Sequence, residues 1–254
     1  MLNHVFILAH EKHFTKVIFD PILLIIVFST VGVIGSGYII NNFYDQEKDL
    51  INRPNKLFID RIISQRTKLY LYFILNGLVL FLSFIISIRA SLFFGGYIFL
   101  IWLYSHKIKK LPIIGNITSA LLSVTPFFAI LLYFKNYNLL IFVFGFYLFL
   151  ILAIKELIKS IENIKGDFTL NYKTVAVIYG EYSTKWIISV MILINCLVSI
   201  LLIFYFDISM MFTFFVGASI YLLILLFFIW TAKERKQYTL IHRLLKLLIL
   251  VGVF

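Results

Sequence analysis

Charged side chains are scarce in this sequence. Asp, Glu, Lys and Arg make up 14% of its 254 residues, while hydrophobic residues make up 62%. Water-soluble domains are usually about 45–50% apolar and about 25% charged. A soluble fold of this size could not bury so much Phe, Leu and Ile, so we expect lipid to surround most of the surface.

Cysteine and proline are also nearly absent. The single cysteine, Cys196, excludes an internal disulfide and a cysteine-based metal site. The chain has four prolines and no Pro-rich or Gly/Ser-rich linker, so we predict one domain over residues 1–254. The segment Met1–Asp20 lacks the small-residue cleavage pattern of a secretory signal peptide.

Long apolar runs fill most of the chain. A membrane-spanning barrel would show segments of about 10 residues that alternate between apolar and polar. Unbroken runs instead favour helices, which satisfy their own backbone hydrogen bonds in lipid. We therefore predict an all-α, polytopic transmembrane helix bundle with about eight spans: Ile22–Ile40, Leu69–Ile88, Leu92–Tyr104, Leu111–Tyr133, Leu139–Ile154 (continuing toward Ile161), Trp186–Phe206, Met210–Trp230 and Leu244–Phe254.

The net charge of +11 is distributed unevenly. Nineteen of the 23 Lys and Arg residues lie in the loops that follow the first, third, fifth and seventh apolar segments or in the residues that flank these loops. Such a bias places these loops in the cytoplasm, with the segment at Ile22 entering from the opposite face. We therefore expect the basic residues to face a lipid bilayer and expect no nucleic acid partner.

Polar residues with a helical spacing begin where the first apolar segment ends. If that helix continues, Asn41, Asp45 and Asp49 stand four residues apart and share one face. Carboxylate and amide oxygens suit Mg²⁺, which often takes one or two carboxylates together with substrate phosphate oxygens. The same residues also fit a solvated helix end, so the spacing alone leaves both interpretations open.

A second polar stripe follows the fifth apolar segment. Glu156, Lys159, Asn163 and Asp167 also fall on one helical face. Two facing carboxylate stripes would repel each other in a low-dielectric setting, and bridging cations would relieve that repulsion. A diphosphate could then bind the cations and nearby basic side chains.

Basic and polar residues near both stripes are candidates for phosphate contact. Arg can bind phosphate oxygens through two parallel hydrogen bonds, whereas Lys acts as a point charge. An amide within a membrane helix, such as that of Asn116, also serves simply to hydrogen-bond a neighbouring helix. The candidate substrate-binding residues are Arg53, Lys56, Arg61, Tyr104, Lys109, Asn116, Lys159 and Lys173.

These stretches resemble a known family. The run Asn41–Asp49, followed by Asn52-Arg53-Pro54, resembles the first aspartate-rich motif of the UbiA superfamily of intramembrane prenyltransferases, N-x-x-x-D-x-x-x-D and then N-R-P. The run Lys159–Asp167 is similar to the second motif, which is close to K-D-I-E-D-x-x-G-D. The stretch Tyr104–Asn116 resembles the segment between the two motifs.

The resemblance implies about nine transmembrane helices around a central cavity that opens sideways to lipid. This chain matches helices two through nine, so we expect it to lack the first. The resemblance also implies transfer of an isoprenyl group from an isoprenyl diphosphate to a lipophilic acceptor, with Mg²⁺ assisting the departure of diphosphate. The acceptor would be a prenyl glycerol phosphate or an aromatic quinone precursor. The second motif looks most like the archaeal ether-lipid branch, which acts on geranylgeranylglyceryl phosphate.

Carried over by position, the resemblance assigns site roles. Asp45, Asp49 and Asp167 would be the catalytic acids, and Arg53, Lys109 and Lys159 would contact phosphate oxygens. The implied metal ligands are Asn41, Asp45, Asp49, Asn163, Asp167 and Glu162.

The sequence departs from the family pattern at three positions. Ser160 and Asn163 stand where Asp is expected, and Lys56 stands where Arg is common. Two alternatives stay open: a transporter or channel that uses the carboxylates at its helix ends, and a catalytically silent relative. Carboxylates at helix ends favour the enzyme, because a transporter more often carries them in mid-span.

Overall fold

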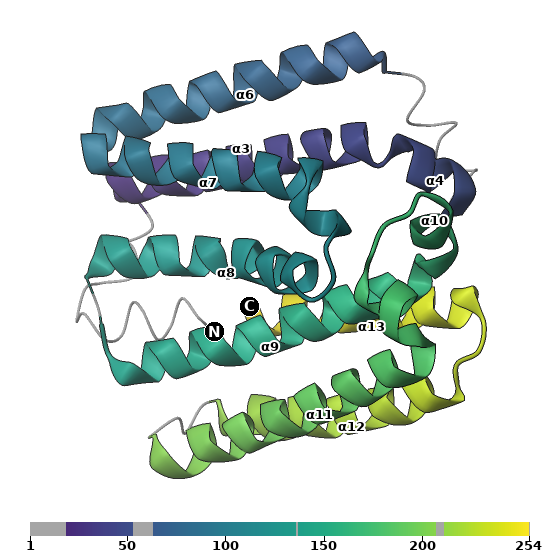
Figure 1. The fold of residues 1–254 in the computed structure, drawn as a ribbon. Coiled ribbons are helices and arrows are strands. Elements are labelled where there is room, and N and C mark those ends of the chain that lie inside the picture. Colours follow the sequence, from purple (N-terminus) through teal and green to yellow (C-terminus); the bar gives the residue numbers. More distant parts are fainter. Residues whose placement is uncertain (1–18, 53–62, 136, 207–210, 254) are drawn as a thin grey trace.

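The computed structural model describes residues 19–52, 63–135, 137–206 and 211–253, and these residues contain helices and no strand. Figure 1 shows the long helices stacked side by side, with the short helices α4 and α10 at one end of the stack. The elements are α3 (Pro21–Tyr44), α4 (Gln46–Asn52), α6 (Gln65–Ile86), α7 (Ile88–His106), the 3₁₀ turn η1 (Ile108–Lys110), α8 (Ile114–Phe134), α9 (Leu139–Glu162), α10 (Ile164–Thr169), α11 (Val175–Tyr205), α12 (Phe212–Thr231) and α13 (Arg235–Val253).

The predicted all-α bundle is confirmed. Seven helices of the described chain are long and apolar enough to cross a membrane: α3, α6, α7, α8, α9, α11 and α12. The eighth predicted span corresponds to α13, which begins with Arg235 and Lys236 and is more polar than the others. The third and fifth spans are longer than their apolar runs, because α7 begins at Ile88 and α9 continues to Glu162.

The outer helices bury only a narrow stripe of side chains. In α3, Asp20 caps the first turn, Pro21 occupies the first helical position, and one face is buried at Ser29, Val33 and Ser36. Many other apolar side chains of α3 are exposed, as expected for a helix that faces lipid.

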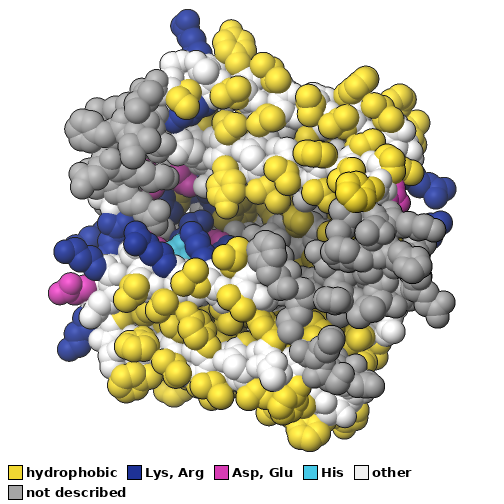
Figure 2. All heavy atoms as spheres, turned by 180° about the vertical axis from the view of Figure 1, so that it is seen from behind, with side chains coloured by type: hydrophobic (Ala, Val, Ile, Leu, Met, Phe, Trp, Pro, Cys, Tyr) yellow, Lys and Arg dark blue, Asp and Glu magenta, His cyan; other side chains and the backbone are white. Residues whose placement is uncertain are grey.

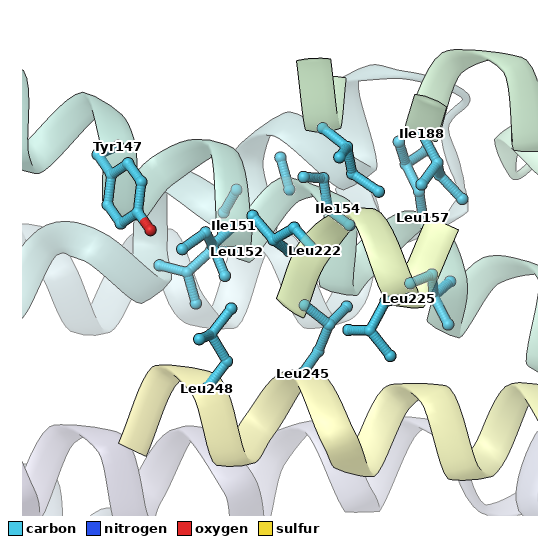
Figure 3. Close-up of a cluster of buried hydrophobic side chains, with 14 of the residues drawn as sticks. Tyr147, Ile151, Leu152, Ile154, Leu157, Ile188, Leu222, Leu225, Leu245 and Leu248 are labelled. Carbon is cyan, nitrogen blue, oxygen red and sulfur yellow. The ribbon is translucent and has the colours of Figure 1, made fainter. Parts of the chain in front are cut away.

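The central helix is α9, which packs against α8, α11 and α13. Its buried residues include Ile151, Ile154 and Leu157, and Figure 3 shows these side chains meeting Leu222 of α12 and Leu245 of α13. This apolar core fixes α9 in place along its length. The polar end of α9 is thereby held at a defined position among its neighbours.

Both predicted motifs lie where a long helix gives way to a short one. Helix α3 ends at Tyr44, and Asp45 joins it to α4 while its backbone N–H still donates to the Asn41 carbonyl at 2.9 Å. Helix α9 ends at Glu162, and Asn163 joins it to α10 in a similar way. Because α4 and α10 pack against each other, the two motifs face each other at the same end of the bundle.

Candidate active site

Residues of both motifs line one small cavity of about 50 Å³. From the first motif come Asn41, Asp45 and Lys48, held by the α3–α4 junction. Asn41 donates its side-chain amide to Asp45 Oδ2 at 2.9 Å, so the two residues are oriented as a unit.

The second motif supplies the opposite wall of this cavity. Glu156, Lys159, Asn163 and Asp167 all line it, as their spacing on one helical face predicts. Glu156 is buried and pairs with Lys155 at 3.1 Å and with Lys159 at 3.4 Å. The charges on the face of α9 that lines the cavity are therefore partly balanced by one another.

Two ion pairs connect parts of the chain that are distant in sequence. Lys48 Nζ lies 2.5 Å from Asp167 Oδ1, which joins the first motif to the second. Lys109 Nζ lies 2.8 Å from Asp45 Oδ1 and donates to Asn41 Oδ1 at 3.4 Å. The partly buried Asp45 and the buried Asp167 are thus each matched by a lysine from a different element, as charges removed from water require.

A close contact between Asn52 and Gly166 holds α4 against α10. The Gly166 N–H donates to Asn52 Oδ1 at 3.2 Å, and Asn52 Nδ2 donates to the Asn163 carbonyl at 3.4 Å. A Cβ on Gly166 would lie 2.3 Å from Asn52 Nδ2, so only glycine leaves room for this amide. The contact positions Asn163 and Asp167 relative to the first motif.

The two acids differ in electrostatic environment. Burial favours the protonated form of Asp45, but Lys109 and Lys48 outweigh it and hold the pKa of this carboxyl below its ordinary value. Burial raises the pKa of Asp167, and Lys48 offsets only part of that effect.

A second, larger cavity of about 640 Å³ adjoins the first and shares with it Asn41, Asp45, Tyr104, Glu156 and Lys159. Its walls come from α3, α4, α7, α8, α9 and α13, so it lies in the centre of the bundle. Tyr38, which lines it, is 75% exposed. Figure 2 shows a hollow in the molecular surface with Lys and Arg side chains at its left side and apolar surface above and below it.

The structure brings most of the predicted site residues together. The small cavity is lined by Asn41, Asp45, Tyr104, Lys109, Asn116, Lys159, Asn163 and Asp167, whereas Asp49 lines only the large one. Lys173 is exposed and lines neither cavity, and its backbone N–H donates to the Lys110 carbonyl at 2.9 Å. Arg53, Lys56 and Arg61 lie outside the described residues.

Glu162, which the resemblance implies as a metal ligand, does not join this group. Its side chain is 0% exposed and faces α13, where His242 Nδ1 lies 2.9 Å from Oε2 and Thr239 donates to Oε1 at 3.1 Å. Successive residues of a helix point about 100° apart, and the position of Glu162 on α9 directs its side chain toward α13 and away from the small cavity. We therefore leave Glu162 out of the candidate metal site.

Several residues of the site were not identified from the sequence. Lys48 lies three positions after Asp45, and this spacing was the only sign that it shares the face of the acids. Ser160, which replaces an expected Asp, accepts the N–H of Ala176 at 3.3 Å and so supports the start of α11. His242 and Lys246 of α13 line the large cavity, although neither residue was predicted to belong to the site.

The oxygen donors of the small cavity fit a hard divalent cation. Carboxylates of Asp45 and Asp167 and amides of Asn41 and Asn163 line it together. Within the described ranges, no three His, Cys, Asp or Glu side chains are close enough to form a metal site by themselves. A cation here would therefore need further ligands, such as water or phosphate oxygens.

Several known proteins are similar in sequence to this chain. The chain is 34% identical to digeranylgeranylglyceryl phosphate synthase of Methanosphaera stadtmanae over 171 residues, which cover 67% of this chain and 62% of the relative. It is also 34% identical to the synthase of the same name from Sulfurisphaera tokodaii over 197 residues, covering 76% of this chain and 70% of the relative. The chain thus aligns with about two thirds of the length of these relatives.

Solved structures share the fold at low sequence identity. An apo UbiA homolog from Aeropyrum pernix K1 matches with a TM-score of 0.74 at 14% identity, covering 100% of this chain and 96% of the other. A UbiA homolog from Archaeoglobus fulgidus bound to GPP and Mg²⁺ matches with a TM-score of 0.69 at 17% identity, covering 91% and 86%.

A comparison with protein families agrees with these matches to individual proteins. The UbiA prenyltransferase family matches residues 5–249, which is nearly the whole chain. Together with the seven apolar helices, this match identifies the protein as a multi-pass integral membrane protein. The chain belongs to the UbiA prenyltransferase family.

Proposed function

We propose that this protein transfers an isoprenyl group from an isoprenyl diphosphate to a prenyl glycerol phosphate acceptor within the membrane. The observation that carries the proposal is the cavity where Asp45 and Asp167 meet among lysines and amides, next to a larger cavity inside the bundle. Family membership and two relatives named digeranylgeranylglyceryl phosphate synthase support the choice of reaction and acceptor.

The small cavity would hold the diphosphate end of the donor. Asp45, Asp167, Asn41 and Asn163, with Asp49 nearby, would hold Mg²⁺, which when bound neutralises charge on the diphosphate and assists its departure. The GPP-bound and Mg²⁺-bound homolog supports this pairing of donor and metal. Lys109, Lys48 and Lys159 would stabilise the negative charge that develops on the leaving group.

The large cavity would hold the prenyl chain and the reacting carbon. Its apolar wall includes Ile34, Ile101 and Leu122, which would exclude water from an allylic cation as the C–O bond breaks. The acceptor hydroxyl oxygen then bonds to that carbon, and the products are an ether, diphosphate and a proton.

A transfer assay with purified full-length protein tests this function. We expect Mg²⁺-dependent formation of the ether from geranylgeranyl diphosphate and geranylgeranylglyceryl phosphate. Asp45→Asn and Asp167→Asn should reduce turnover by at least about 100-fold, the scale of losing charge stabilisation at a reacting centre. Glu47→Gln is the matched control, because Glu47 lies in the same motif but is exposed and lines neither cavity.

Two results would contradict the proposal. Full turnover by Asp167→Asn would show that the second motif is not part of the site. Absence of transfer with every acceptor, in protein that is folded, would favour a transporter or a silent relative.

We further propose that the motif end of the bundle faces the cytoplasm. The Lys and Arg bias of the loops supports this orientation. Single cysteines replacing exposed Lys107 and Lys135 in a Cys196→Ser background provide the test. A membrane-impermeant thiol reagent added outside the cell should label Lys135→Cys and spare Lys107→Cys, and the opposite pattern would overturn the orientation.

A further inference from the structure

Helix α13 contributes two nitrogen-bearing side chains to the large cavity. His242 and Lys246 stand one helical turn apart and both line it. Lys155 and Lys159 of α9 line the same cavity, and α9 packs against α13. These residues define a cationic wall formed by Lys155, Lys159, His242 and Lys246.

The walls of the cavity differ in charge. Asp45 and Asp49 are on the α3–α4 side, where the proposed metal would bind. On the cationic wall, Glu156 is the acid that lines the cavity, and it is shared between Lys155 and Lys159. The cationic wall is therefore net positive, and its residues Lys155, His242 and Lys246 line the large cavity but not the small one.

Glu162 fixes the orientation of His242. A carboxylate only accepts hydrogen bonds, so the Nδ1 atom that lies 2.9 Å from Glu162 Oε2 carries the proton. Nε2 is then the ring nitrogen available to a ligand in the cavity, and it donates to a phosphate oxygen when the ring carries a proton on both nitrogens. Thr239 holds the other carboxylate oxygen, and Arg235 Nε donates to the Glu162 carbonyl at 3.2 Å, so α13 is anchored to the end of α9.

We propose that His242 and Lys246, together with Lys155, bind the phosphate group of the acceptor lipid. This inference rests on the proposed function and assigns the part of the site that recognises the acceptor. A donor diphosphate and an acceptor phosphate in one cavity repel each other, and a separate set of cations offsets that repulsion. Binding the phosphate at α13 would place the rest of the acceptor in the large cavity, beside the donor.

Binding of the acceptor alone provides the test. Geranylgeranylglyceryl phosphate is titrated into purified full-length protein with EDTA and without donor. Losing one charge-assisted hydrogen bond should weaken this binding by about ten-fold in Lys246→Gln and in His242→Gln. Lys246 is exposed, so its replacement removes the charge with little loss of packing.

Matched controls separate this site from general effects of charge. Arg243→Gln removes a cation from the same helix, but Arg243 is exposed and does not line the cavity, so acceptor affinity should be unchanged. Mg²⁺-dependent affinity for geranylgeranyl diphosphate should be unchanged in Lys246→Gln. The phosphate-free glycerol ether should bind Lys246→Gln and the parent protein equally.

Three outcomes would overturn the inference. The first is unchanged acceptor affinity in both variants while the parent protein catalyses transfer, which rejects this site alone. The second is equal competition by phosphatidylglycerol, which would make the wall a general site for anionic lipid. The third is a parent protein that transfers no prenyl group to any acceptor, which rejects the proposed function itself.

Discussion

Asp45 and Asp167 line the same cavity, but they are expected to respond differently to pH. Lysines hold the pKa of Asp45 below its ordinary value, so this carboxyl stays ionised over the working range. Burial raises the pKa of Asp167. As the pH decreases, this carboxyl therefore takes up a proton at a higher pH than an ordinary aspartate does. Because only the ionised form binds a cation well, we expect Asp167 to set the acid limit of the proposed metal binding.

This difference predicts how donor binding depends on pH. Mg²⁺-dependent affinity for geranylgeranyl diphosphate should be full at neutral pH and fall as the pH decreases through the raised pKa of Asp167. The fall should begin above the ordinary aspartate range. Geranylgeraniol, which has no phosphate, is the control and should bind equally throughout, and a flat profile for the diphosphate would contradict the role of Asp167.

Asn163 is the residue at which this site differs most directly from the family pattern. Its amide offers a neutral oxygen where the family has a carboxylate, so Asn163→Asp should bind Mg²⁺ more tightly than the parent protein. We expect the affinity for Mg²⁺ to increase by about ten-fold or less. A charge-assisted contact contributes on this scale, and the new carboxylate also repels Asp167. Asn163→Ala should bind more weakly in the same titration, and weaker binding by Asn163→Asp would count against the assigned geometry.

At the scale of the elements, the ends of α3 and α9 position the residues of the candidate active site. The 3.6-residue period correctly predicts that Glu156, Lys159, Asn163 and Asp167 face one cavity. It could not predict that α11 begins at Val175 instead of Trp186, since polar residues such as Thr184 interrupt the apolar run. Gly180 bends α11 within this polar stretch, with φ of 78° and ψ of 168°.

The contact between α4 and α10 is predicted to depend on one glycine. In Gly166→Ala, the new Cβ would meet the Asn52 amide, and overpacking of this kind costs about 1–3 kcal/mol of unfolding free energy. Turnover should fall as well, because Asp167 would shift relative to Asp45. The free energy of unfolding is measured by denaturant titration in mixed detergent micelles.

A double-mutant cycle isolates this contact. In Asn52→Ala with Gly166→Ala, the smaller side chain at 52 leaves room for the Cβ, so the combined loss should be smaller than the sum of the two single losses. Strictly additive losses would indicate that the two residues do not touch.

Gly180 offers a second prediction at this scale. Its backbone conformation is essentially restricted to glycine. Gly180→Ala should therefore lower the free energy of unfolding by about 1–3 kcal/mol, although no neighbouring atom lies within 4 Å of the added Cβ. Gly217→Ala is the matched control, because Gly217 lies inside helix α12 and also has no neighbour within 4 Å. That control should be neutral or should stabilise by up to about 1 kcal/mol, and equal effects in the two variants would exclude backbone strain at Gly180.

At the scale of the whole molecule, composition was enough to predict a helical membrane bundle, and two spaced motifs were enough to predict the family. Contacts between distant segments were not predictable, because helical periodicity assigns a residue to a face but does not identify what packs there. The pairs Lys48–Asp167 and Lys109–Asp45 are of this kind, and so is the contact of Glu162 with His242. The roles assigned to Arg53, Lys56 and Arg61 stay predictions.

The central claim is that two motifs, far apart in sequence, form one metal-dependent diphosphate site at one end of the bundle. The most direct test is binding of geranylgeranyl diphosphate to purified protein in detergent, with and without Mg²⁺, beside Asp45→Ala and Asp167→Ala. We predict binding that requires Mg²⁺ and is lost in both variants. Binding that is unchanged by EDTA, or that survives either substitution, would contradict the claim.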